Sequence, residues 1–192
     1  MKMKSIALAA LMFGVSMAAQ AAPSVLSQSY VNGEYNYQSV NGDTATHGIS
    51  GTLSYQLSDG LFASVSGDKY RASNANSNDS EAVTVGYQYF LDPQFAVLGS
   101  VGGTRLSRTL NGTTVNWGPT AEGLLQWAPA SRLGLSVGLK YDHYNRLSNL
   151  QTSTTWLVGQ ANVAVWKNLQ AVAYIQNDHT GNEVGVGGQL MF

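Results

Sequence analysis

Apolar and polar residues alternate along most of the chain. In residues 47–57, for example, the apolar Ile49, Leu53 and Tyr55 are separated by small or polar residues. Successive side chains of a strand point to opposite faces, so this alternation predicts β-strands rather than helices, whose apolar positions recur at three- and four-residue spacing. Ten strands are predicted in this way, at residues 28–40, 47–57, 61–71, 82–91, 95–106, 115–127, 133–144, 154–166, 169–177 and 183–192.

The connections between these strands alternate in length. Short turns are predicted at 58–60, 92–94, 129–132 and 167–168, and longer polar loops at 41–46, 72–80, 107–114, 145–153 and 178–182. Neighbouring strands are then antiparallel, with the short turns at one end of the sheet and the loops at the other. Transmembrane β-barrels show this asymmetry.

The second face of the predicted strands is polar without being charged. Serine, threonine, glycine, glutamine and asparagine dominate it, and charged residues make up 11% of the chain, against about 25% in soluble domains. A soluble sandwich would carry more charge on its exposed faces and edges. A bilayer instead requires every backbone group to be paired, so the sheet must close. The fold predicted is all-β, a closed antiparallel up-and-down transmembrane β-barrel of ten strands. Eight or twelve strands also fit, because the first and ninth segments are the least regular, and Pro119 predicts a bulge or local distortion.

The N-terminal residues have the layout of a secretory signal peptide. Lys2 and Lys4 precede an uncharged apolar run, which ends in the small residues of Ala19-Gln20-Ala21. The run is too short to cross a bilayer as a helix, which needs about 20 apolar residues. The predicted division is a signal peptide at residues 1–21 and a barrel domain at 22–192. Acidic residues outnumber basic ones after the signal, which gives no basic surface for nucleic acid.

Aromatic residues are predicted to gather at the two ends of the outward face. Tyr55, Tyr87, Tyr89, Phe95, Trp127 and Phe192 fall near the short turns, and Tyr35, Tyr37, Trp117 and Tyr141 fall near the loops. Rings of this kind favour the level of the lipid headgroups, so two aromatic belts are expected.

Signal peptide, alternating strands, aromatic belts and terminal phenylalanine together resemble the small outer-membrane β-barrel proteins of Gram-negative bacteria. The resemblance implies export through the periplasm to the cell outer membrane, contact with outer-membrane lipid and lipopolysaccharide, and a monomer. It also implies an assembly signal read by the barrel-assembly machinery, in which Val184, Val186, Leu190 and Phe192 match the family pattern and Gly188 departs from it by being small.

A few charged residues are predicted on the inward face, at Glu34, Asp68, Glu122, Lys140, Asp142 and Glu183. Glu122 and Lys140 should lie opposite each other on adjacent strands, where opposite charges stabilise a sheet. They are interpreted as an ion pair that neutralises charge in a narrow interior. The alternative interpretation is a gate whose charges select ions. Small residues on the same face leave room for a narrow water path but not for a wide channel.

The functions compatible with these features are a structural role or narrow-pore passage of small solutes. The alternatives are a surface interaction protein acting through its external loops and, less favoured, a lipid-directed enzyme. Asp142-His143 and Asp178-His179 are the carboxylate–histidine neighbours, but adjacent strand residues point to opposite faces, so no catalytic residue is predicted. Scattered histidines and the absence of cysteine predict no metal site and no cofactor. The cations near the loops, Lys69, Arg71, Arg105 and Arg108, are positioned to contact lipid headgroups.

Overall fold

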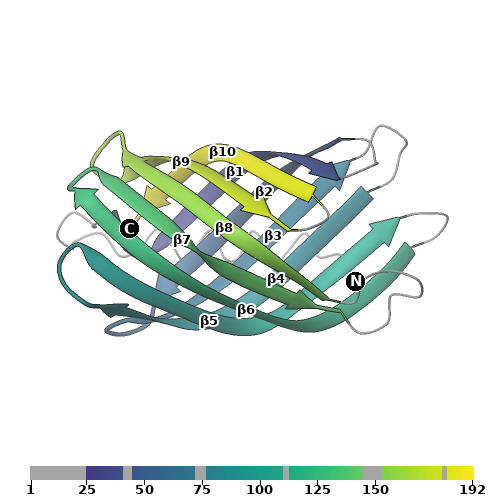
Figure 1. The fold of residues 1–192 in the computed structure, drawn as a ribbon, viewed down its shortest axis with the longest axis horizontal. Helices are drawn as coiled ribbons and strands as arrows, with labels where there is room; N and C mark the ends of the chain where they lie inside the picture. Colours follow the sequence, from purple (N-terminus) through teal and green to yellow (C-terminus); the bar gives the residue numbers. More distant parts are fainter. Residues whose placement is uncertain (1–24, 41–44, 72–76, 110–112, 145–152, 179–180) are drawn as a thin grey trace.

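The computed structural model describes residues 25–40, 45–71, 77–109, 113–144, 153–178 and 181–192, so the predicted signal peptide at 1–21 lies outside the described residues. Ten strands form one closed barrel (Figure 1), which confirms the predicted fold and strand number. The strands are β1 (Tyr30–Val40), β2 (Thr46–Gln56), β3 (Leu61–Arg71), β4 (Ser77–Phe90), β5 (Phe95–Thr109), β6 (Thr113–Ala130), β7 (Leu133–His143), β8 (Ser153–Ala164), β9 (Leu169–Asn177) and β10 (Gly181–Met191).

The strands follow one another around the barrel in chain order, and all of the pairs are antiparallel. The barrel closes between β1 and β10, in a ladder that runs from Tyr30 opposite Met191 to Val40 opposite Gly181. In Figure 1 the short turns and the C-terminus lie at the left end of the barrel. We call this the turn end, and the opposite end the loop end.

Alternation along each strand separates an apolar outer wall from a polar interior. Val83 and Val186 point outward and are 61% and 62% exposed, whereas the inward-facing Asn36 and Gln189 are 0% and 2% exposed. This is the reverse of a soluble domain, in which apolar residues fill the interior. The outer wall therefore suits an apolar surrounding. No helix in the described part of the chain combines the length and apolar character needed to cross a bilayer.

Three strands are longer than the alternation predicts. β4 begins at Ser77 instead of residue 82, β5 continues to Thr109, and β6 runs from Thr113 to Ala130. The extra residues at the loop end are polar, so hydrophobic alternation does not reveal them. Outward-facing ion pairs stabilise this extension, between Lys69 and Asp79 at 3.6 Å and between Arg105 and Glu81 at 3.0 Å.

The short turns have the chemistry that their residues predict. In the β2–β3 turn, Gly60 adopts a φ of 76°, a conformation that is open to glycine but strained for other residues. The Leu57 N–H donates to the Leu61 carbonyl at 2.8 Å, and the Leu61 N–H donates to the Ser58 carbonyl at 3.1 Å. In the β4–β5 turn, the Asp92 carboxylate accepts backbone N–H groups from the residues that follow it.

The ladders show no bulge at Pro119, where the sequence predicts a bulge or local distortion. Pro119 pairs in register with Gly103 of β5, and the β6–β7 ladder begins one residue later, at Thr120 opposite Asp142. Proline has no N–H to donate, and this position does not require one because the paired part of β7 has already ended. The irregularity in this ladder lies instead at the turn end, between Trp127 and Ala130.

Aromatic side chains stack at the turn end of the outer wall. The Phe95 and Trp127 rings lie 5.8 Å apart and nearly parallel, and Phe192 stacks on Tyr55 with its ring centroid 6.4 Å away. At the loop end, the exposed Trp117 lies beneath the Arg105 guanidinium, 5.7 Å from the ring centroid. Aromatic residues thus occur on the outer wall at both ends, as the sequence predicts.

Candidate functional site

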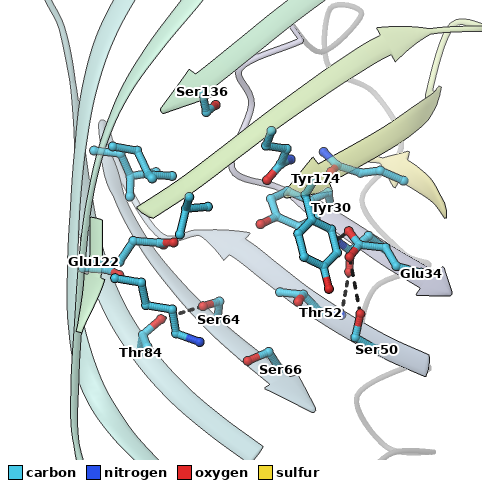
Figure 2. A pocket seen from close by; sticks show the side chains of 18 of the residues that line it. Tyr30, Glu34, Ser50, Thr52, Ser64, Ser66, Thr84, Glu122, Ser136 and Tyr174 are labelled. Carbon is cyan, nitrogen blue, oxygen red and sulfur yellow. Dashed lines mark hydrogen bonds between the residues drawn. The ribbon is translucent and has the colours of Figure 1, made fainter. Parts of the chain in front are cut away.

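The interior of the barrel holds a cavity of about 250 Å³. It extends from Val25 and Gln28, which lie inside the turn end, to Tyr70 and Glu183 toward the loop end. Figure 2 shows part of its lining, where side chains from strands on different sides of the barrel point into a common space. The cavity is the candidate functional site because it follows the axis along which a solute would have to pass.

The acidic residues predicted on the inward face lie in this interior. Glu34, Asp68 and Glu122 line the cavity together with Glu183, and Asp142 is buried beside them. Lys140 is the basic member of the group and also lines the cavity. Carboxyl groups therefore outnumber amino groups among these residues.

The structure confirms the predicted register of Glu122 and Lys140 but gives the lysine a different ion-pair partner. The two residues are directly opposite each other on β6 and β7. The Lys140 Nζ atom lies 3.4 Å from the Asp142 Oδ2 atom of its own strand. Residues two apart share one face of a strand, and long side chains lean along it, which brings these two groups together. Glu122 and Asp68 are more distant charges that also act on Lys140.

A carboxylate held by two tyrosines is the largest polar cluster that sequence reasoning missed. The Tyr70 and Tyr174 hydroxyls both donate to Glu183 Oε1, and Gln176 Nε2 donates to Glu183 Oε2 at 2.8 Å. Asn36 Nδ2 in turn donates to the Tyr70 hydroxyl at 3.1 Å. We call these five residues the Glu183 cluster. It links β1, β3, β9 and β10 across the closing ladder. In the sequence, the only clue to this cluster was that each tyrosine falls on the polar face of its strand.

The remaining interior carboxylates are bound by hydroxyl and amide groups. Glu34 accepts hydrogen bonds from Asn32 Nδ2 at 2.9 Å and from Ser50 Oγ at 3.3 Å, as the dashed lines in Figure 2 show in part. Asp68 accepts a hydrogen bond from Ser80 Oγ. These donors stabilise charged oxygens away from bulk water, where unpaired charges would be costly.

An apolar layer crosses the interior between the charged residues and the turn end. Phe62, Leu98, Leu124 and Val158 pack together, with Trp156 against them. Leu124 is the next inward-facing residue after Glu122 toward the turn end. The sequence predicts small and polar residues on this face, so the layer narrows the path more than was expected.

The N-terminal segment narrows the turn end further. Val25 and Leu26 are buried against Ala96 inside the barrel, and the Leu26 carbonyl accepts a hydrogen bond from Gln88 Nε2 at 2.8 Å. We call residues 25–28 the inner segment. The sequence of this segment has no periodic pattern that would distinguish it from the start of a strand. The first strand was therefore predicted to begin at residue 28, whereas it begins at Tyr30.

Gly185 allows the Glu183 cluster to pack. A Cβ atom at this position would lie 2.1 Å from Tyr174 Cε1 and 2.7 Å from Asn36 Oδ1. Both of those side chains are held by hydrogen bonds or burial, so neither is free to move aside. Gly188 of the same strand differs, because its nearest neighbour would lie 3.9 Å away.

Substitution of Gly185 by alanine is therefore expected to lower the free energy of unfolding by about 1–3 kcal/mol, the usual cost of overpacking. The matched Gly188→Ala variant should unfold like the wild type. Urea unfolding of the two variants in the same detergent, followed by heat-modifiable migration on gels, measures the difference. Equal midpoints for both variants would show that the cluster tolerates the added methyl group.

Of the two carboxylate–histidine neighbours in the sequence, the structure describes both members of the Asp142-His143 pair, and these two side chains do not meet. Asp142 faces the interior and His143 faces outward, as alternation requires. The His47 ring lies on the outer wall, where its Nδ1 atom is 2.9 Å from the Tyr35 hydroxyl. His179 lies outside the described residues. Among the residues that the structure describes, no group of three or more histidine, aspartate or glutamate side chains is arranged to hold a metal ion.

Comparison with known proteins gives this architecture a family. Residues 6–177 match the family described as "Outer membrane protein beta-barrel domain". No curated protein sequence matches the chain. Among solved structures, the NanC porin is similar over 84% of this chain and 99% of its own, with 10% identity and a TM-score of 0.53. The KdgM porin has the same coverage, with 13% identity and a TM-score of 0.48.

The N-terminal barrel domain of Pseudomonas aeruginosa OprF is a further similar structure. It has 13% identity and a TM-score of 0.48, over 86% of this chain and 98% of the domain. The match to NanC shows a shared fold, and the match to the family model shows the family. The chain belongs to the outer membrane protein β-barrel domain family, and its place is the outer membrane.

Proposed function

We propose that this protein is a narrow outer-membrane pore that favours small cations and small neutral solutes. The observation that carries the proposal is the cavity that follows the barrel axis, with more carboxylates than ammonium groups along it. Charges on the wall of a narrow path act strongly on a passing ion, because the surrounding protein screens them less than water does. The path suits water and small ions, because the apolar layer and the inner segment both narrow it.

The shared fold supports passage as the role of this barrel. NanC, which shares the fold, is described as a porin. The proposal assigns no catalytic residue to this chain. A surface role through the external loops is the other candidate, but parts of those loops lie outside the described residues, and no described contact favours it.

We further infer the route by which the protein reaches its place. The signal-like N-terminus supports export through the periplasm, and the outward-facing Val184, Val186 and Leu190 of β10, followed by Phe192, support recognition by the barrel-assembly machinery. The self-closing sheet leaves no unpaired edge between β1 and β10, which supports a monomer.

Single-channel recording in a planar bilayer tests the proposed pore. With a potassium chloride gradient across the bilayer, we expect a small conductance. The sign of the reversal potential should show that potassium passes more readily than chloride. A reversal potential of the opposite sign would contradict the role of the carboxylates. Conductance equal to that of a protein-free bilayer would contradict passage altogether.

Glu122→Gln is expected to reduce the preference for cations several-fold. The variant removes one negative charge from the interior, and at an effective dielectric constant near 20 such a charge changes the energy of an ion about 10 Å away by about 1–2 kcal/mol. Lys140→Gln should shift the reversal potential in the opposite direction, since it removes a positive charge. Glu81→Gln is the control, because its carboxylate lies on the outer wall beside Arg105. Equal reversal potentials in all three variants would show that the charges of Glu122 and Lys140 do not act on passing ions.

A further inference from the structure

Small residues line one side of the turn end, where the inner segment packs. They lie on four neighbouring strands, β5 to β8, and are Ala96, Ala128, Gly134 and Ala164. The next inward residue on β5 is the larger Leu98, which belongs to the apolar layer. Val25 and Leu26 fill the space that the small residues leave, and they are only 5% and 4% exposed.

A glutamine of the barrel wall holds the backbone of the inner segment. Gln88 Nε2 donates to the Leu26 carbonyl at 2.8 Å and to Gln126 Oε1 at 2.7 Å. Both glutamines are buried, so the contact with Gln126 holds the donor in position independently of the segment. In peptide recognition, hydrogen bonds to the backbone contribute affinity and pockets for side chains contribute specificity. We call the four small residues and Gln88 the peptide site.

The inner segment is joined to the barrel at Ser29, which has its own contacts with the wall. The Ser29 carbonyl accepts the Phe192 N–H at 3.2 Å, and Ser29 Oγ accepts the Gln56 N–H at 3.1 Å. These two bonds do not involve residues 25–28. The segment can therefore leave the peptide site without opening the ladders of β1.

The balance of free energies favours an exchange of the segment between bound and released states. Burial of two aliphatic side chains is favourable, but the ordering of four backbone residues costs a free energy of similar size. We propose that the inner segment is a tethered ligand of the peptide site, which accepts a short peptide with two adjacent aliphatic residues. Its release opens the turn end. The opening of a path rests on the proposed pore, whereas the binding of the peptide does not.

Binding of an acetylated peptide with the sequence of residues 25–29 tests the peptide site. The protein is the mature chain from Ala22 with Val25→Ser and Leu26→Ser, which weakens the tethered competitor while keeping the chain length. Fluorescence anisotropy of the labelled peptide in detergent measures the affinity. The same two serine substitutions in the peptide should weaken its binding by about tenfold or more, because they remove both buried aliphatic side chains.

The glutamine donor is tested in the same protein. Gln88→Leu should weaken peptide binding by about fivefold, the effect of one lost hydrogen bond. Gln38→Leu is the matched control, because its amide lies at the loop end beside Thr46, and it should bind the peptide like its parent. Heat-modifiable migration checks that both variants fold. Equal losses in the two glutamine variants, or no binding of the peptide to their parent, would overturn the proposal.

A disulfide tests whether the inner segment leaves the site. A Cβ atom at Gly134 would lie 3.4 Å from Val25 Cβ, close to the separation found in disulfides, and the chain has no cysteine of its own. A chain with both Val25→Cys and Gly134→Cys should exclude the free peptide when oxidised and bind it when reduced. Gly134→Cys alone is the control, and oxidant should not change its affinity. Peptide binding to the fully oxidised double variant, or exclusion that persists after reduction, would contradict the exchange.

Single-channel recording tests the opening of the turn end. The wild-type chain and the reduced double variant should show brief openings to a higher conductance, which the disulfide abolishes. Openings that persist in the fully oxidised variant would show that release of the segment does not open the turn end. An absence of conductance in every chain would contradict the proposed pore, and peptide binding would still decide whether the segment exchanges.

Discussion

A chain that begins at Ser29 is expected to conduct several-fold more than a chain that begins at Ala22, the predicted mature start. The shorter chain lacks the inner segment, whose Val25 and Leu26 are buried inside the turn end. Its removal leaves β1 intact, because that strand starts at Tyr30. Both chains can be refolded into detergent without a signal peptide, so export does not enter the comparison.

Loss of the inner segment should also cost stability. Burial of one aliphatic side chain contributes about 1.5–3 kcal/mol, so the shortened barrel should unfold at a lower urea concentration while keeping its heat-modifiable migration. A folded, less stable barrel with unchanged conductance would assign the constriction to the apolar layer around Phe62 and Leu98 instead. The double variant Val25→Ser and Leu26→Ser keeps the chain length and should give an intermediate conductance.

Deletion of Phe192 is expected to remove most of the assembled protein from the outer membrane of cells. The Phe192 ring stacks on Tyr55 at the turn end, and its backbone N–H donates to the Ser29 carbonyl at 3.2 Å. An aromatic pair of this kind contributes about 0.5–1.5 kcal/mol, which is small beside the stability of a barrel. The expected cellular loss therefore reflects recognition of the last strand during assembly.

The comparison of refolding in detergent with assembly in cells separates the two effects. The truncated protein should refold in detergent almost as well as the full chain, and Phe192→Tyr should restore cellular assembly because it keeps the ring. The measurement is the fraction of protein that migrates as folded barrel in unheated membrane samples. Full cellular assembly of the truncated chain would show that Phe192 is not part of the assembly signal.

The outer wall was more predictable than the interior. Strand pairing follows from local alternation and from closure of the sheet, so even the register of Glu122 and Lys140 could be inferred from the short turn between their strands. The additional residues of β4, 77–81, could not be inferred from alternation. They are polar, and pairing with the neighbouring strands holds them in place. Alternation identifies which residues face inward, but not which of them meet across the barrel.

The Glu183 cluster and the inner segment show why the interior is harder to infer. Tyr70 and Glu183 are far apart in the chain, and their contact depends on how the strands are tilted and staggered when the barrel closes. The inner segment packs by filling space that the surrounding strands leave open. No short sequence pattern indicates either arrangement, so both could be found only in the three-dimensional structure.

The chain-order arrangement of the strands has a consequence for folding. Every ladder except one joins strands that are consecutive in the sequence, and the exception is the closing ladder between β1 and β10. Hairpins form by closing short loops, and the entropy cost of loop closure rises with the length of chain enclosed. We therefore expect the ladder between the two ends to form last, because it encloses far more of the chain than any hairpin does.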